Sequence, residues 1–162
     1  MNDKFKKKVV NKEVTLGAWM QIGHCAVAEI FARSGSHWVC VDLEHGAIGI
    51  ETMTDIFRTL DAFDCAPVAR LPFNDPAWIH RCLDAGAAGL IIPMVNSAQE
   101  AEAAVTEAKY PPRGKRGFGY SRANMHGIDF DSYIEQANSR LTMIMQIEHK
   151  DAIENLEQIA QV

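Results

Sequence analysis

The 162-residue sequence predicts an α/β protein built on a parallel β-sheet. Two observations support this fold class. Short apolar segments alternate with amphipathic segments of helical length, which is typical of successive βαβ units. Several of the short segments, such as residues 66–70 and 89–94, are apolar at nearly every position. This is expected of parallel strands that are covered on both faces.

The predicted elements follow one another in a regular order. The predicted strands are 15–22, 37–42, 66–70, 89–94 and 141–148. The predicted helices are 26–34, 50–63, 76–85, 98–109, 130–138 and a last one from 150 to the chain end. Asp75 before Pro76 and a capping box at 97–100 indicate helix starts, and Gly35 and Gly86 occupy expected C-cap positions. The Gly/Pro-rich segment 110–124 is a predicted loop with room for one more short strand around Phe118.

Composition argues against two classes of protein. With a net charge of −5 and a pI near 5.6, the chain lacks the basic character of nucleic-acid-binding proteins. No window reaches the ~18 uninterrupted apolar residues of a membrane span, and the N-terminus has no apolar core of a secretory signal. We therefore expect a cytoplasmic protein with no nucleic-acid or membrane partner, and a solvated N-terminal turn at the lysines 6–8.

The cysteines also indicate a cytoplasmic protein. Cys25, Cys40, Cys65 and Cys82 lie in apolar contexts and never in a C-x-x-C pair. This pattern predicts reduced core thiols rather than a zinc site or a disulfide framework.

Polar residues gather where the predicted strands end. Ligands of α/β proteins bind at the carboxyl ends of parallel strands, so this arrangement predicts an active site. These polar residues, in chain order, are Asp42, Glu44, His45, Arg70, Asn96, Gln146, Glu148 and His149, and Pro93 also follows the fourth predicted strand.

Three of these residues carry specific hypotheses. His45 is a candidate acid/base, because imidazole titrates near neutral pH; the alternative is a loop histidine bonded to the backbone. Arg70 ends an apolar strand and could grip a substrate carboxylate; the alternative is a structural ion pair. Glu148, with Gln146 on the same strand face, suits Mg²⁺ or Mn²⁺; the alternative is a pair with Arg70.

Two further features have less specific interpretations. Asp84 falls near the end of a predicted helix, on the opposite side of the βα unit from the strand ends, which favours a structural capping role. The glycine- and cation-rich loop 113–119 matches no phosphate-binding motif. It could attract an anionic substrate, but a solvated basic loop is the simpler expectation.

Several segments together resemble a known family. They are GAWMQIG (17–23), WVCVDLEHG (38–46), PVARLPFNDP (67–76), LDAGAAGLIIPMV (83–95), YPPRGKRGFG (110–119) and MQIE (145–148). In this order, and over nearly the whole chain, the series resembles the HpcH/HpaI family of pyruvate-dependent class II aldolases. That family includes enzymes acting on 2,4-dihydroxyhept-2-ene-1,7-dioate and on 2-dehydro-3-deoxy-sugar acids.

The resemblance implies a fold and an assembly. It implies a TIM (β/α)₈ barrel of the phosphoenolpyruvate/pyruvate type, assembled into trimers or hexamers. Such barrels have about 250 residues. Residues 1–162 are therefore expected to form a single, C-terminally incomplete barrel domain with about the first six βα units, lacking a second metal carboxylate. Whether the chain is active as it stands is left open.

The resemblance also implies roles for particular residues. A divalent cation (Mg²⁺, Mn²⁺ or Co²⁺) would be chelated by pyruvate and bound by Glu148, with Gln146 beside it in the substrate pocket. Asp42 would contact metal-bound water. His45 would be the base and Arg70 would grip pyruvate and its enolate. Asp84 would support the histidine across a subunit interface.

The implied reaction joins the enolate of pyruvate to an aldehyde, or splits a 4-hydroxy-2-oxo acid into the two. Two alternatives remain open. One is a related barrel lyase or decarboxylase acting on an oxo-diacid or a citramalyl-CoA-like substrate, although the sequence shows no dedicated CoA-binding segment. The other is a non-catalytic, truncated barrel that serves as an assembly partner.

Overall fold

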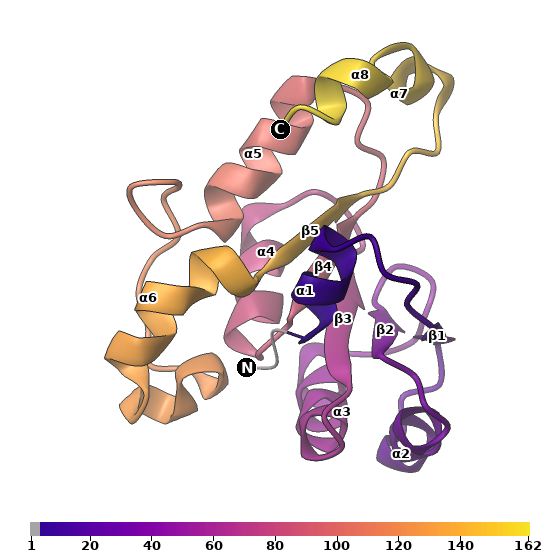
Figure 1. Ribbon diagram of the computed structural model, residues 1–162, viewed down its shortest axis with the longest axis vertical. Coiled ribbons are helices and arrows are strands. Elements are labelled where there is room, and N and C mark those ends of the chain that lie inside the picture. The colour runs from indigo at the N-terminus through magenta and orange to yellow at the C-terminus, as the bar shows by residue number, and fades with distance from the viewer. Residues whose placement is uncertain (1–3) are drawn as a thin grey trace.

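The computed structural model describes residues 4–162, and their strands form one parallel sheet (Figure 1). The strand order is β1-β2-β3-β4-β5, and every neighbouring pair is parallel. The strand bounds are β1 Gly17–Met20, β2 Trp38–Asp42, β3 Ala66–Arg70, β4 Gly89–Ile92 and β5 Thr142–Met145. The predicted α/β class and all five predicted strand segments are confirmed.

The helices that connect one strand to the next lie around the outside of the curved sheet, whereas the N-terminal helix packs on its inner face (Figure 1). The helices are α1 Lys4–Val10, α2 Cys25–Arg33, α3 Ile50–Ala62, α4 Pro76–Asp84, α5 Ala98–Ala108, the 3-10 helix η1 Arg122–Gly127, α6 Phe130–Arg140, α7 Lys150–Glu154 and α8 Leu156–Ile159. None of the helices in residues 4–162 has the length and apolar character needed to cross a bilayer.

The two faces of the sheet carry different side chains, because alternate residues of a strand point to opposite sides. The outer face packs against α2–α5 and forms the main core, which includes Val41, Leu90, Phe57 and Ile79. The inner face carries a second apolar cluster around Cys40, Val68 and Ile91. Beyond this cluster, the inner face ends in polar side chains at the carboxyl ends of the strands.

The predicted helix caps are present. The Asp75 carboxylate accepts hydrogen bonds from the first turn of α4, with Pro76 at the first helical position. Ser97 caps α5, and the Glu100 side chain accepts the N–H of Asn96 rather than that of Ser97. Gly35 and Gly86 have φ values of +93° and +99°, as C-cap glycines require.

The structure confirms the predicted core position for three of the four cysteines, and Cys25 is only partly buried. All four cysteines are free, and Cys40, Cys65 and Cys82 are buried. Burial raises the pKa of the Cys65 thiol to about 11 and that of Cys40 to about 12. These thiols are therefore protonated and act as small core side chains.

Three sequence-based expectations are corrected by the structure. Residues around Phe118 form no strand, so the described part of the chain has five strands rather than six; Phe118 instead stacks on Tyr110, with ring centroids 4.9 Å apart. The basic N-terminal segment is not a solvated turn but helix α1. Phe5 anchors α1 on the inner face, where its ring lies 6.0 Å from that of Trp38. The last helix is divided at Asn155 into α7 and α8.

Candidate active site

Asp42 and Arg70 form a buried ion pair at the carboxyl ends of β2 and β3. The two residues are direct register partners in the sheet, and both side chains lie on its inner face. Asp42 is 0% exposed and Arg70 is 5% exposed. The Arg70 Nε donates to Asp42 Oδ1 at 2.9 Å and Nη2 donates to Oδ2 at 2.6 Å. This two-point contact fixes the plane of the guanidinium.

Four more donors converge on the Asp42 carboxylate. The Gln21 amide donates at 2.8 Å and the Trp19 indole at 3.1 Å. The backbone N–H groups of Glu44 and His45 donate at 3.0 and 3.1 Å. Trp19 reaches Asp42 because the β1 register pairs it with Cys40, which lies on the same inner face as Asp42. Gln21 follows directly after β1, two residues from Trp19. Asp42 therefore accepts six hydrogen bonds, whereas a carboxylate offers about four lone-pair sites.

These contacts set the charge state of the pair. Burial opposes ionisation of Asp42, but the hydrogen bonds from Arg70, Gln21, the His45 N–H and Trp19 outweigh it and hold the pKa of the carboxyl well below its usual range. Burial likewise opposes the charge of Arg70, and the hydrogen bond and negative charge of Asp42, with the charge of Glu44, raise its pKa. The pair is thus ionised at neutral pH.

A dependence of stability on acidity follows from the lowered pKa of Asp42. An unfolded aspartate has a pKa of about 3.9. The contribution of Asp42 is therefore complete above that value and is lost as the pH falls toward the lower pKa of the folded state. Urea unfolding from pH 7 to pH 2 should show this loss in the wild type and a weaker acid dependence in Asp42→Asn. Equal acid dependence in both proteins would contradict the lowered pKa.

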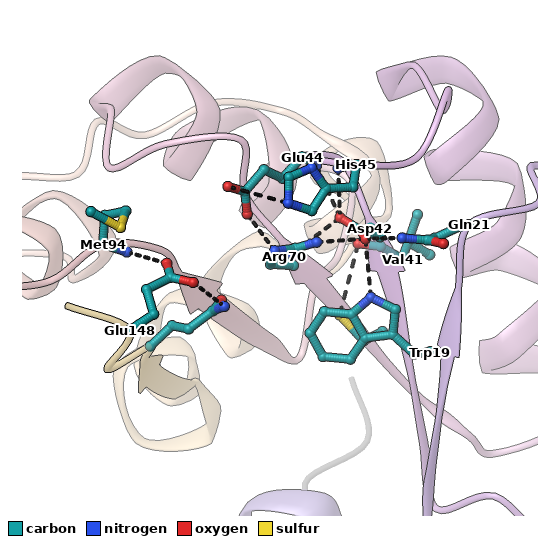
Figure 2. Close-up of polar contacts among 11 residues, drawn as sticks. Trp19, Gln21, Val41, Asp42, Glu44, His45, Arg70, Met94 and Glu148 are labelled. Carbon is teal, nitrogen blue, oxygen red and sulfur yellow. Dashed lines mark hydrogen bonds and ion pairs between the residues drawn. The ribbon is translucent and has the colours of Figure 1, made fainter.

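Arg70 retains capacity for a further ligand. Its third hydrogen bond runs from Nη1 to the carboxylate of Glu44 (Figure 2). Within the described residues, two of the five guanidinium N–H groups therefore have no hydrogen-bond partner. The guanidinium also lies over the Trp19 ring, 5.3 Å from its centroid. The structural ion pair considered from the sequence is therefore present, with two donors left for an anion.

His45 lies at the rim of this cluster. Its side chain is 67% exposed, and Nε2 lies 3.9 Å from an oxygen of Glu44 (Figure 2). Its backbone, by contrast, is held by Asp42. The loop after β2 therefore fixes the position of His45 while leaving the imidazole accessible from solvent.

Glu148 and Gln146 form a separate polar group beyond the end of β5. Glu148 Oε1 accepts the N–H of Met94, and Oε2 accepts the Gln146 amide N–H, both at 2.8 Å (Figure 2). The Gln146 Oε1 atom is buried and has no hydrogen-bond partner. Within residues 4–162, Arg70 forms ion pairs with Asp42 and Glu44, and the alternative pairing of Glu148 with Arg70 is not observed. Residues 4–162 contain no group of three or more His, Cys, Asp or Glu side chains arranged to hold a metal.

Asp84 is not part of this cluster. It ends α4, which runs back from the carboxyl end of β3 toward the start of β4, so Asp84 lies at the opposite end of the sheet from His45. Its carboxylate accepts a hydrogen bond from Arg116 Nη2 at 2.7 Å. In the loop 113–119, Arg113 and Lys115 are exposed as expected of a solvated loop, but Arg116 is buried. The expectation of a solvated basic loop is therefore wrong for Arg116.

Two residues of the cluster, Trp19 and Gln21, are not among the predicted site residues, and Glu44 is predicted at the site but without a specific role. Trp19, Gln21 and Glu44 complete the hydrogen bonding of Asp42 and Arg70. A signal was available for two of them. In GAWMQIG, positions 19 and 21 share one strand face, and a polar side chain at 21 next to a buried strand calls for a polar partner.

The fold and the site together define a class of protein. Successive βα units that bring charged and polar side chains to the carboxyl ends of parallel strands are characteristic of βα-barrel enzymes. The comparison with known proteins narrows this class. Residues 15–162 match the model of the HpcH/HpaI aldolase/citrate lyase family, and the chain belongs to this family.

Individual relatives support this assignment. The chain is 38% identical over 159 residues to a 4-hydroxy-2-oxovalerate aldolase of Novosphingobium aromaticivorans, a match that covers 98% of this chain and 60% of that protein. It is 37% identical over 159 residues to a 5-keto-4-deoxy-D-glucarate aldolase of Escherichia coli O139:H28, covering 98% of this chain and 62% of that protein. The chain thus spans about three fifths of the length of these relatives.

Solved structures confirm the predicted barrel type. A HpcH/HpaI aldolase/citrate lyase family protein from Burkholderia cenocepacia superposes with a TM-score of 0.92 at 31% identity, covering 98% of this chain and 64% of that one. Macrophomate synthase gives a TM-score of 0.83 at 26% identity, covering all of this chain (100%) and 57% of that one. The described residues correspond to a partial barrel of this type, with five βα units.

Proposed function

We propose that this chain carries the pyruvate-binding residues of a divalent-metal-dependent aldolase, a carbon–carbon lyase that cleaves or forms 4-hydroxy-2-oxo acids. The observation that carries the proposal is the Arg70 guanidinium. It is held rigidly by Asp42, has two N–H donors without a partner among the described residues, and lies at the same strand ends as His45, whose imidazole is accessible at the rim of the cluster. The two aldolases named above as relatives support the reaction class.

Each residue has a defined task in this proposal. Arg70 binds the carboxylate of pyruvate with its two remaining N–H groups, and its fixed positive charge stabilises negative charge that develops on the enolate oxygen. His45 takes a proton from the methyl carbon and returns it in the reverse direction. Asp42 keeps Arg70 in position. The contact of Asp42 with metal-bound water, suggested by the family resemblance, stays a prediction. Because six donors already surround the Asp42 carboxylate, the geometry favours its role in positioning Arg70.

The residues beside the cluster fit a hard divalent cation. Each oxygen of Glu148 accepts one hydrogen bond and keeps lone pairs, and the buried Oε1 of Gln146 has no partner. Both groups are oxygen donors, which Mg²⁺ and Mn²⁺ prefer, and Mg²⁺ in particular takes part of its coordination from water and substrate. A cation bound there would supply Lewis-acid stabilisation of the enolate.

Asp84 enters the proposal only through a second copy of the chain. Within one copy it lies at the far end of the sheet from His45. We propose that the protein is a homo-oligomer, a trimer or hexamer, in which Asp84 of one copy approaches His45 of another. A carboxylate beside the imidazole would stabilise its protonated form.

Pyruvate release tests the proposed reaction. The protein is incubated with Mg²⁺ and a short 4-hydroxy-2-oxo acid, and pyruvate is followed by its reduction with lactate dehydrogenase. Metal-dependent pyruvate formation is expected. Turnover of a citramalyl-CoA-like or oxo-diacid substrate alone would indicate the related lyase, and absence of all turnover from a folded protein would indicate a non-catalytic barrel.

Replacing Glu148 with glutamine is expected to weaken Mn²⁺ binding by about tenfold or more. The substitution keeps the shape of the side chain but removes the charge that attracts the cation. Titration of Mn²⁺ followed by electron paramagnetic resonance measures the change. Glu102→Gln, an exposed glutamate on α5, is the matched control and should bind as the wild type does. Equal affinity in both variants would contradict the assignment of Glu148.

A further inference from the structure

Arg116 is a buried arginine in an otherwise exposed loop. Its side chain is 3% exposed, whereas those of Arg113 and Lys115 lie in solvent. The guanidinium carbon lies 4.5 Å above the Tyr110 ring, and Nη1 donates to the Tyr133 hydroxyl at 3.1 Å. A stacked ring below and a hydroxyl at one edge fix both the plane and the rotation of the guanidinium.

Among residues 4–162, Asp84 is the only carboxylate that this guanidinium contacts. Nη2 donates to Asp84 Oδ1 at 2.7 Å. The Asp84 side chain is nevertheless 45% exposed. Among the described residues no hydrogen bond reaches its second oxygen, Oδ2. One oxygen is therefore held from inside the protein, while the other has no partner among the described residues of this copy.

The energetic cost of burying Arg116 indicates that its pair with Asp84 is more than an ordinary surface ion pair. An exposed aspartate needs no partner, because water solvates it, and an exposed ion pair contributes little stability. Burying a guanidinium is expensive, and here its Nε is buried without a hydrogen-bond partner. The burial of Arg116 therefore costs stability, and its effect is to fix the direction of the half-exposed Asp84 carboxylate.

We propose that Arg116 is a positioning residue for Asp84. It holds Oδ1 in a frame formed by Tyr110 and Tyr133, so that Oδ2 stays directed outward as an acceptor for the imidazole N–H of His45 in a second copy. The inference rests on the proposed role of Asp84 in the oligomer. It adds that the aromatic frame around Arg116 sets the geometry of that contact.

A double-mutant cycle on the intact protein tests the inference. The variants are Asp84→Asn, Arg116→Lys and the two combined. The rate of deuterium exchange at the methyl group of pyruvate is measured by NMR with Mg²⁺. Because a displaced catalytic contact can slow a reaction by up to about 100-fold, each single variant should lose about tenfold or more in maximal rate. The KM for pyruvate should stay within about twofold, since neither residue contacts pyruvate in the proposed site.

The combined variant gives the decisive result. If Arg116 acts through Asp84, the double variant is no slower than Asp84→Asn alone. If the two losses multiply, Arg116 has an independent structural role and the inference is wrong. Arg116→Lys with a wild-type rate, beside a slow Asp84→Asn, would also overturn it while leaving the proposed role of Asp84 intact. A wild-type rate in Asp84→Asn would refute that proposed role and the inference with it.

A milder variant covers the case in which Arg116→Lys does not fold. Tyr133→Phe removes the hydroxyl that holds Nη1 and leaves the ion pair between Arg116 and Asp84 in place. It should lower the maximal exchange rate by a smaller factor than Arg116→Lys does. In the Asp84→Asn background it should cause no further loss. An unchanged rate in Tyr133→Phe would overturn the proposed role of the aromatic frame.

Discussion

Replacing His45 with alanine is expected to slow proton exchange at the methyl group of pyruvate by on the order of 10²–10⁴-fold, which is the usual contribution of a general base. Folding should be unaffected, because the imidazole is 67% exposed and its Nε2 lies as far as 3.9 Å from the Glu44 carboxylate. Deuterium incorporation followed by NMR measures the rate, and the thermal unfolding midpoint reports stability.

His126→Asn is the matched control for the His45 variant. His126 is also exposed but lies in η1, outside the proposed site. Its backbone φ is +56°, a conformation that asparagine tolerates. This variant should keep the wild-type exchange rate. If His45→Ala exchanged as fast as this control, another group would be the base; if it lost its fold, His45 would be structural.

Replacing Asp42 with alanine is expected to lower the free energy of unfolding by about 3–5 kcal/mol, the usual consequence of removing one partner of a buried ion pair. Arg70 would keep its charge in a buried position, and its remaining counter-ion in the described part of the chain would be the partly buried Glu44. Gln21, Trp19 and two backbone N–H groups would also lose their acceptor. Urea unfolding at pH 7 measures the change.

Asp55→Ala provides the comparison for an exposed ion pair. Asp55 pairs with Arg58 on the surface of α3, where both side chains are exposed. Removing it should change the free energy of unfolding by less than about 1 kcal/mol. A similar small effect for Asp42→Ala would mean that water reaches Arg70 in solution and that the guanidinium is not held as described.

The burial of Arg70 also affects how its role can be tested. Arg70→Ala would leave the Asp42 carboxylate buried without its cation, so lost activity in that variant would include lost stability. Arg70→Lys keeps a positive charge but cannot make the two-point contact. His45 and Arg70, which the sequence presents as equivalent candidates, therefore require different experiments.

Much of the fold could be predicted from local sequence signals. Asp75 followed by Pro76 correctly marked the start of α4, and strand 66–70 was identified with its observed bounds. Errors arose where tertiary contacts decide the structure. The basic segment at 6–8 becomes helical because Phe5 packs on the inner face. Phe118 stacks on Tyr110 instead of pairing in a strand.

The site was predictable in its location but not in its hydrogen bonding. Asp42, His45 and Arg70 were placed together because each follows or ends a strand of one parallel sheet. The partners of Asp42 depend on the register between β1 and β2, which local patterns do not specify. Arg116 was missed because its burial depends on Tyr110 and Tyr133, and the surrounding glycines and cations are typical of a solvated loop.

Exchange at the methyl group of pyruvate is the most direct test of the central claim, because it requires only the half-reaction and no knowledge of the aldehyde. The 162-residue protein is incubated with pyruvate in D₂O with Mg²⁺, and then with a chelator, while the methyl signal is followed by NMR. We expect exchange that depends on the metal and is lost on chelation. Absence of exchange from a folded, metal-loaded sample would contradict the proposal that His45, Arg70 and Glu148 of this chain form a working pyruvate site.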